Sequence, residues 1–532
     1  MNRTRRDVLG LFILSLMVRL ATAAFIPRPG YMDTAYYAAG AVRLAQGGGL
    51  SEPFLWNYLD DPAGLPHPGF LYWMPLPSLL AAPFAALFPA SFFALQFPFA
   101  VLSALLPLVA YGLAWETSGR RRSAWLAGLI TLFSGFFFPY WTLPETFAPF
   151  ALFGSLALWL AGTWKLDAGN WMLDIGRWLL VGLLVGLAHL TRADGILLLP
   201  VVVLASLVSP LSRSTQRATR NTHHALHSIF RHLSFIVLGY LLVMVPWFAR
   251  NLTLIGAPLS PAGPRTLWLR AYDDLFCYRC DVSLRSYLAW GWTDILRSKL
   301  WAMRVNFERF LAEDCLVFLL PFVLTGLSRL RRRPLFILST LYLVLIYLAH
   351  TLAFTFPGAR GGFFHASAAI LPFLFTAGVE GLDAAVGWAA RQRRWNLRQA
   401  QLVFGVATVV LAAFLGVYAT AQKLPAWRHV DSVYEEIGQW LTQGNMDGET
   451  VMVANPAAFW YYTGYPAVVV PNGGAEAVLA VADRYGVRHV VLDRNRPAPL
   501  AGLYVQETRH PRLRPVMAWG EGEKRVVLYA VQ

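Results

Sequence analysis

The chain has 532 residues, of which 56% are hydrophobic and 14% charged, and its mean hydropathy is +0.47. This composition indicates a polytopic α-helical membrane protein rather than a soluble globular one. The formal net charge of +15 does not indicate nucleic-acid binding, because the basic residues form short clusters between apolar runs instead of an aromatic-interleaved surface.

The apolar runs and the basic clusters together predict how the chain crosses the membrane. A spanning helix needs about 20 apolar residues, and eleven segments are assigned on that basis: 7–26, 92–115, 124–140, 146–164, 177–190, 195–211, 233–254, 315–328, 334–356, 363–387 and 400–420. Six basic clusters lie between them: Arg3, Arg5 and Arg6; Arg120, Arg121 and Arg122; Lys165 and Arg177; Arg213, Arg217, Arg220 and Arg231; Arg329, Arg331, Arg332 and Arg333; and Arg391, Arg393, Arg394 and Arg398. If all six face the cytoplasm, the N-terminus is cytoplasmic and the C-terminus lies outside the cell membrane.

On this topology the residues outside the membrane gather on its outer side. They form two loops, 27–91 and 255–314, and a tail, so we expect a transmembrane domain over 1–420 and an extracytoplasmic α/β domain over 421–532. Within the tail the pattern predicts a helix from Gly474 to Tyr485. Strands are predicted at 450–454, 467–470, 487–492 and 525–531.

The first outer loop carries Asp33, a few positions past the first span. A carboxylate at a membrane edge, flanked by aromatic residues, is suited to act as a base on a substrate delivered by the bilayer. The alternative is a helix-end or N-capping residue before an amphipathic helix from Tyr36 to Leu44. Further along the loop, His67 opens the stretch 67–77, whose prolines and aromatic residues are typical of an interfacial element and not of a span.

Three further charged residues lie in outer turns. Glu145 is the only acid in the short second outer turn, where it either favours the dipole of the next helix or orients a cation or a substrate hydroxyl. Arg192 and Asp194 lie between two apolar runs, a costly place for charges near lipid. They either pair with each other, or Arg192 snorkels or contacts the phosphate of an anionic lipid.

The stretch 357–365 lies between two later spans and contains Arg360 and His365. These residues are suited to complete an anion site, although an isolated arginine at this level is more often an interfacial anchor. Arg19 lies inside the first span, where we expect a structural role, either paired with an acid or snorkelling.

Two of the three cysteines, Cys277 and Cys280, lie in an outer loop as Cys-Tyr-Arg-Cys. A zinc site needs two more ligands at matching spacing, and none is apparent in the sequence. A disulfide or two free thiols is therefore expected.

These pieces resemble the GT-C membrane glycosyltransferases, in the branch of the dolichyl-phosphate-mannose–protein mannosyltransferases and the lipid A aminoarabinose transferases. The matching segments are Met32–Tyr37, His67–Trp73, Leu190–Gly195, Arg360–Pro372 and, in the tail, Ala454–Gly464. The sequence departs from the family at two places: Thr34 follows the first-loop acid where several relatives have Glu, and Glu145 stands where relatives often have Asp.

The resemblance implies inverting transfer of a sugar from a polyprenyl-phosphate carrier to a lipid, glycan or protein acceptor at the outer membrane face. It makes Asp33 the catalytic base and Arg192 and Arg360 the contacts of the donor phosphate. The secondary site residues are Glu145, His67, Asp194 and His365, and Glu145 is the candidate ligand if a divalent metal takes part.

Other functions stay open at this point. One is transfer of a lipid-linked oligosaccharide, and another is a polytopic transporter or flippase, although the sequence lacks the inverted repeat typical of transporters. A third is a scaffold whose tail binds a partner. Deletion of 421–532 is expected to spare an enzyme's membrane site and to abolish a scaffold.

Overall fold

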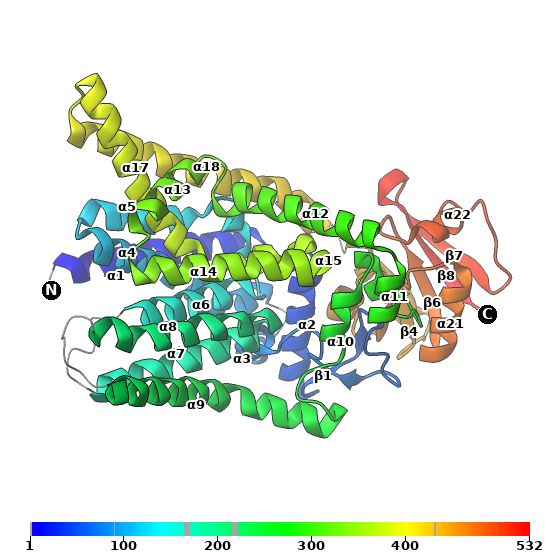
Figure 1. The fold of residues 1–532 in the computed structure, drawn as a ribbon. Helices are drawn as coiled ribbons and strands as arrows, with labels where there is room; N and C mark the ends of the chain where they lie inside the picture. Colours follow the sequence, from blue (N-terminus) through cyan, green and yellow to red (C-terminus); the bar gives the residue numbers. More distant parts are fainter. Residues whose placement is uncertain (1–2, 90, 164–170, 215–221, 430–431) are drawn as a thin grey trace. The chain divides into compact units, whose positions relative to one another are not determined.

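A computed structural model describes residues 3–89, 91–163, 171–214, 222–429 and 432–532 (Figure 1). Lys165, Arg217 and Arg220, assigned above to basic clusters, lie outside the described residues, as does the side chain of Arg213. The chain forms two compact units. The helical unit comprises Met1–Phe25, Gln96–Thr253 and Ser298–Gln422, and the mixed unit comprises Ile26–Leu95, Leu254–Arg297 and Lys423–Gln532.

Each of the eleven predicted segments contains a helix. These are α1 (Arg3–Phe25), α4 (Phe92–Ser118), α5 (Arg121–Phe133), α6 (Phe147–Gly162), α7 (Trp171–Thr191), α8 (Leu198–Ser214), α9 (Thr222–Ile255), α13 (Leu320–Leu330), α14 (Pro334–Leu348), α17 (Leu371–Arg393) and α18 (Leu397–His429). Among the described residues, seven helices are long and apolar enough to cross a membrane, and four shorter apolar helices accompany them. Proline in the first turn of α13, α14 and α17 marks where these helices start, because proline lacks the N–H that an interior position needs.

Two predicted spans are interrupted in the structure. The segments expected at 334–356 and 363–387 are broken between α14 and α17 by short helical pieces, with one proline and three glycines at 357–362. These are η6 (Ala349–Ala353), α15 (Thr355–Pro357), η7 (Gly358–Gly362), α16 (Phe363–Ser367) and η8 (Ala368–Ile370), of which η6 and η7 are π-helical. Such irregular backbone is typical of functional sites in helical proteins.

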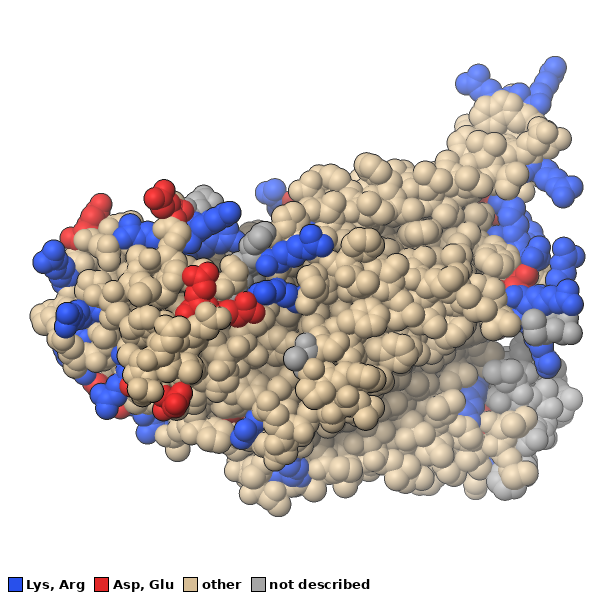
Figure 2. Space-filling model, turned by 180° about the vertical axis from the view of Figure 1, so that it is seen from behind, with Lys and Arg blue, Asp and Glu red and all other residues tan. Residues whose placement is uncertain are grey.

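Ion pairs join several helices of the helical unit at one end, which we call the basic end. Asp7 of α1 accepts from Arg121 of α5 at 2.5 and 2.6 Å, and Asp383 of α17 accepts from Arg122. Glu380 of α17 forms ion pairs with Arg120 and with Arg329 of α13. Figure 2 shows basic side chains gathered at one end of a broad, largely uncharged face. The basic clusters at Arg120–Arg122 and at Arg329, which are far apart in the sequence, therefore lie at one end of these helices.

Helices α13 and α17 cross so closely that only glycine fits at the contact. A Cβ atom on Gly326 would lie 1.8 Å from the carbonyl oxygen of Ala377, and one on Gly381 would lie 1.9 Å from that of Phe322. Small residues let membrane helices approach to backbone contact.

Gly326→Ala is expected to lower the free energy of unfolding by about 3 kcal/mol, because the added methyl group must push two backbones apart. Thermal unfolding of the purified protein in detergent measures the effect. Gly387→Ala is the matched control, because its Cβ would meet only the end of a flexible arginine at 3.8 Å. Alanine favours helix by about 1 kcal/mol there, so equal destabilisation by both variants would contradict the backbone contact.

The mixed unit is built on a six-stranded sheet in the order β2-β5-β4-β6-β8-β7. Strands β2, β5, β4 and β6 run parallel, and β8 and β7 pair antiparallel. The strands are β2 (Phe54–Leu55), β4 (Thr450–Val453), β5 (Ala467–Val469), β6 (Val487–Leu492), β7 (Leu513–Trp519) and β8 (Val526–Val531). The four strands and the helix predicted in the tail are present, the helix as α21 (Ala475–Tyr485).

The tail does not complete this sheet alone, in contrast to the expectation of a separate domain over 421–532. Strand β2 comes from the first outer loop, where Phe54 pairs with Ala467 of β5. The loop also contributes α2 (Met32–Ala45), β1 (Ser51–Glu52), β3 (His67–Pro68) and α3 (Leu76–Leu87), and the tail adds α19 (Ser432–Gln443) and α20 (Pro456–Thr463). Helix α20 packs against α2. The two loops, 27–91 and 255–314, thus contribute most of their residues to one compact unit with the tail.

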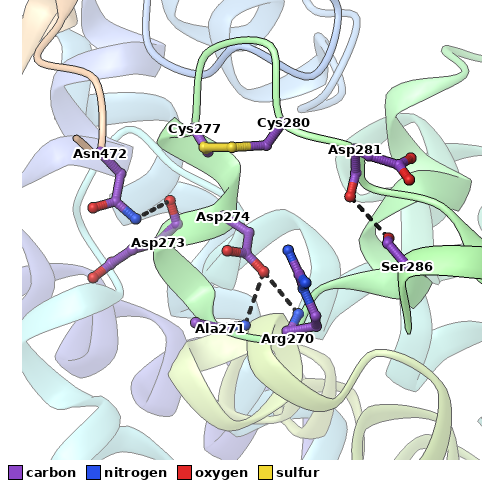
Figure 3. Close-up of a disulfide and its surroundings, with 9 residues drawn as sticks. All are labelled: Arg270, Ala271, Asp273, Asp274, Cys277, Cys280, Asp281, Ser286 and Asn472. Carbon is purple, nitrogen blue, oxygen red and sulfur yellow. Dashed lines mark hydrogen bonds between the residues drawn. A yellow bond between two sulfur atoms is a disulfide. The ribbon is translucent and has the colours of Figure 1, made fainter. Parts of the chain in front are cut away.

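The second outer loop holds the two neighbouring cysteines. Cys277 and Cys280 form a disulfide, with their Cα atoms 5.6 Å apart (Figure 3). Of the two states expected for these cysteines, the structure therefore has the disulfide and not the free thiols. Asp273 lies in the same loop, and its peptide oxygen accepts a hydrogen bond from the side-chain amide of Asn472 in the tail, at 3.3 Å (Figure 3). The loop is thus fastened to the turn that follows β5.

Candidate functional site

A largely buried ion pair lies where α7 ends and a short 3-10 turn, η2 (Ala193–Leu197), begins. The Nε and Nη2 atoms of Arg192 donate to the two carboxylate oxygens of Asp194, at 2.9 and 2.7 Å. The predicted pair is therefore confirmed. The turn requires Gly195, because a Cβ there would lie 2.5 Å from the backbone of Ala188.

A histidine that the sequence analysis missed supports this pair. The Nε2 atom of His350, in η6, lies 3.3 Å from an oxygen of Asp194, and its side chain is only 5% exposed. A Cβ on Gly362 would lie 3.1 Å from the His350 ring, so the glycines of η7 let this segment pack on the imidazole. The only signal in the sequence was an ionisable residue inside an apolar run, which is costly unless it is used.

A second group of polar side chains precedes α6. The Thr146 hydroxyl hydrogen-bonds Nδ1 of His365 at 2.8 Å, and Oε2 of the fully buried Glu145 lies 3.8 Å from that nitrogen. The His365 ring stacks on Phe147 with centroids 3.9 Å apart. Nη1 of Arg192 donates to the Thr146 hydroxyl at 3.5 Å, which links this group to the ion pair.

Arg360 lies at the edge of the same region. Its side chain is exposed, and its peptide oxygen accepts from Nη2 of Arg309 at 3.2 Å. Arg309 also donates to the peptide oxygen of Ala359 at 3.2 Å and pairs with Glu313 at 3.0 Å. Arg309, which the sequence analysis did not single out, therefore holds the backbone that carries Arg360.

We call the six contacting residues the polar cluster: Glu145, Thr146, Arg192, Asp194, His350 and His365. They come from four separate stretches of the chain but meet within the helical unit. The cluster offers a guanidinium to an anion. Glu145 and His365 offer an oxygen and a nitrogen of the types that bind a divalent cation such as zinc.

Asp33 lies in the mixed unit, in the first turn of α2. The helix begins at Met32, with Tyr31 as N-cap, and not at Tyr36 as expected. Asp33 is therefore a helix-end residue, as the alternative held, but not the N-cap, and its carboxylate has the first-turn position that the helix dipole favours. The residue is partly buried, and three aromatic side chains, Tyr31, Tyr36 and Tyr37, flank it in sequence.

His67, also of the mixed unit, is buried and holds the first loop together. Its Nε2 lies 3.0 Å from the peptide oxygen of Phe54 in β2 and 3.6 Å from Glu52. The Glu52 carboxylate also accepts from the Tyr36 hydroxyl and, at 2.6 Å, from the amide of Phe70. His67 thus connects the strand of the loop to the helix that carries Asp33.

Burial raises the pKa of the Glu52 carboxyl, opposed by His67 and by the hydrogen bond from Tyr36. A carboxyl with a raised pKa stabilises the folded state at pH values below its unfolded pKa, and this stability is lost as the pH rises through the folded value. Glutamine does not titrate, so Glu52→Gln removes this loss of stability. We therefore expect the unfolding temperature of the variant to rise relative to that of the parent between pH 5 and pH 8. A pH-independent difference would contradict the buried carboxyl.

Arg19 has neither of the two expected environments. Its side chain is fully buried, and Nη2 donates to the peptide oxygen of Leu132 at 2.7 Å. The guanidinium also lies 5.3 Å from the Phe138 ring and 5.8 Å from the Trp141 ring. No acid among the described residues pairs with it. Arg19 thus ties the C-terminal half of α1 to the C-terminal end of α5.

Residues 66–250 match the family described as dolichyl-phosphate-mannose-protein mannosyltransferase, a stretch that includes His67, Glu145, Arg192 and Asp194. No curated protein matches the chain in sequence. Among solved structures, ArnT from Cupriavidus metallidurans, bound to undecaprenyl phosphate, is similar with a TM-score of 0.60 and 15% identity, over 99% of this chain and 98% of that one.

The oligosaccharyltransferase AglB from Archaeoglobus fulgidus, in complex with an inhibitory peptide and a dolichol-phosphate, is also similar. Its TM-score is 0.54 at 13% identity, over 100% of this chain and 75% of that one. At these identities the likeness concerns the fold. The chain therefore contains a segment that matches this family of mannosyltransferases, and its fold is similar to that of ArnT and AglB.

Proposed function

We propose that the protein transfers a sugar from a polyprenyl-phosphate carrier to an acceptor hydroxyl at the outer face of the cell membrane. The observation that carries the proposal is the polar cluster, in which Arg192 lies among buried polar groups of the helical unit. A guanidinium in such a place is costly unless it is paired or used, and it suits a phosphate anchored in the bilayer.

The proposed topology has eleven spans, a cytoplasmic N-terminus and the mixed unit outside. Its support is the basic end, because clustered arginines mark the cytoplasmic side. The chain passes from the helical to the mixed unit at the C-terminal ends of α1 and α9 and near that of α18. None of the six predicted basic clusters lies at these ends.

The proposed reaction is a single displacement at the anomeric carbon. The Asp33 carboxylate takes the proton of the acceptor hydroxyl as the new bond from its oxygen to the sugar forms. The bond between the sugar and the phosphate oxygen breaks on the opposite side, so the anomeric centre inverts. Polyprenyl phosphate departs with the electron pair, and Arg192 and Arg360 stabilise the charge that develops on it.

The other site residues prepare these groups. Asp194, supported by His350, orients the guanidinium of Arg192, and His67 holds the loop that carries Asp33. Glu145 and His365 together are suited to hold a divalent cation, with Oε2 and Nδ1 at 3.8 Å. Such a cation would supply further positive charge for the departing phosphate.

The test is incubation of the purified protein with a panel of polyprenyl-phosphate sugars and detection of released polyprenyl phosphate. We expect release with one donor or a few, and only when an acceptor is present. A lipid-linked oligosaccharide donor would release polyprenyl pyrophosphate if its carrier is a pyrophosphate. Accumulation of an unmodified substrate in proteoliposomes, with no release from any donor, would overturn the proposal in favour of a transporter.

A further inference from the structure

A groove on the flank of the helical unit lies between α1 and α4. Its volume is about 370 Å³, and Leu9 in its wall is 46% exposed, so the groove opens to the side of the helices. Arg5, Val8, Leu9 and Phe12 of α1 and Leu105 and Leu108 of α4 line it, with Thr4 beside Arg5. Its walls are therefore apolar except where Thr4 and Arg5 lie, which suits a hydrocarbon chain with a polar head.

The length of the groove fits one leaflet of a bilayer. From Thr4 to Phe12 the helix rises roughly 12 Å at 1.5 Å per residue. Half of the hydrocarbon core is about 15 Å. One acyl chain of a lipid in that leaflet therefore matches the groove along most of its length.

The polar end of the groove carries positive charge. Arg5 is exposed and flanked by Arg3 and Arg6 in the first turns of α1, and no carboxylate of the described residues pairs with it. Asp7, the nearest acid in sequence, is neutralised by Arg121 at 2.5 and 2.6 Å. Basic pockets between membrane helices on the cytoplasmic side attract anionic lipid headgroups.

We infer that this groove binds an anionic glycerophospholipid, with one acyl chain along α1 and α4 and its phosphate at Arg5. The site is distinct from that of the proposed donor, whose phosphate is assigned to Arg192 in the polar cluster. Arg5 lies two residues before Asp7, whose pair with Arg121 is part of the basic end. A lipid held here bridges two helices and stabilises the helical unit.

The experiment is native mass spectrometry of the full-length protein in detergent, titrated with phosphatidylglycerol, phosphatidylcholine or polyprenyl phosphate, together with thermal unfolding in the same lipids. We expect one tightly bound phosphatidylglycerol and a higher unfolding temperature. Arg5→Gln should weaken binding about fivefold, since one basic residue near a lipid surface contributes about 1 kcal/mol. Arg331→Gln removes the same charge from another exposed basic cluster and should leave binding unchanged.

A second pair of variants tests the acyl chain. Leu9→Trp fills the groove and should abolish the specific binding, whereas Ile13→Trp, on the same helix and equally 46% exposed, lies outside the lining and should preserve it. Equal binding of phosphatidylcholine, or Arg331→Gln acting like Arg5→Gln, would overturn the inference. Preferential displacement of phosphatidylglycerol by polyprenyl phosphate would also overturn it, because the groove would then serve the donor. None of these readouts depends on glycosyl transfer.

Discussion

Asp33→Asn is expected to lower kcat for glycosyl transfer about 1,000-fold and to leave the KM for the donor within about threefold. A positioned base contributes roughly 10²- to 10⁴-fold to such a step, and asparagine keeps the shape of the side chain but cannot take the proton. Because Asp33 lies in the first turn of α2, losing its charge costs the helix at most about 1 kcal/mol. Steady-state kinetics with the donor found in the panel, and thermal unfolding in parallel, measure both effects.

The matched control is Asp61→Asn, which removes the same charge from the same loop. Asp61 has a left-handed backbone with φ of 37° and accepts from the Tyr485 hydroxyl at 3.0 Å, and asparagine tolerates both roles. Its transfer rate should stay close to that of the parent. Retained transfer in Asp33→Asn, at normal expression and unfolding temperature, would remove Asp33 from the role of base.

Arg192→Met is expected to lower kcat/KM for the donor about 100-fold and to destabilise the helical unit by about 3 kcal/mol. The first effect is the loss of a charged contact to the donor phosphate, and 100-fold corresponds to about 2.7 kcal/mol. The second arises because Asp194, whose side chain is 11% exposed, is left without its main partner. Kinetics and thermal unfolding measure the two effects separately.

The double variant Arg192→Met/Asp194→Leu distinguishes a role in binding from a role in structure. An apolar pair of similar volume removes the unpaired carboxylate, so the unfolding temperature should return toward that of the parent. If Arg192 binds the donor, activity stays low in the double variant. Recovery of both stability and activity would show that the arginine serves only its partner.

The helices were predictable and their interruptions were not. Apolar runs of 14 to 25 residues predict helices by composition alone, and basic clusters predict which ends lie together. The break between α14 and α17 depends on glycine contacts across the fold, such as that of Gly358, where a Cβ would lie 2.2 Å from the carbonyl oxygen of His350. Contacts of this kind leave no periodic pattern in the sequence.

For the site, the sequence identified charged residues in turns but not their partners. The Arg192–Asp194 pair was predictable, because two residues in one turn can meet without help from the fold. His350 lies 156 positions beyond Asp194 and contacts it only through tertiary structure. The partner of Arg19 is the peptide oxygen of Leu132, and a backbone acceptor cannot be predicted from the positions of acidic residues in the sequence.

The tail deletion no longer separates an enzyme from a scaffold. Helix α20 packs against α2, which carries Asp33, and β5 pairs with β2 of the same loop. Deleting 421–532 removes both supports and is expected to inactivate the enzyme as well. Asp33→Asn, which leaves the tail intact, distinguishes the two functions instead.

The pairing of β2 with β5 also has a consequence during translation. Phe54 and Ala467 are 413 positions apart, and at about 5–20 residues per second roughly 20–80 s pass between their synthesis. Until then the nascent chain exposes the unpaired edge of β2 and the apolar face of α2 that α20 later covers. A premature stop codon before the codon for Pro456 removes both α20 and β5, and should therefore yield a protein that inserts into the membrane but never becomes an active enzyme.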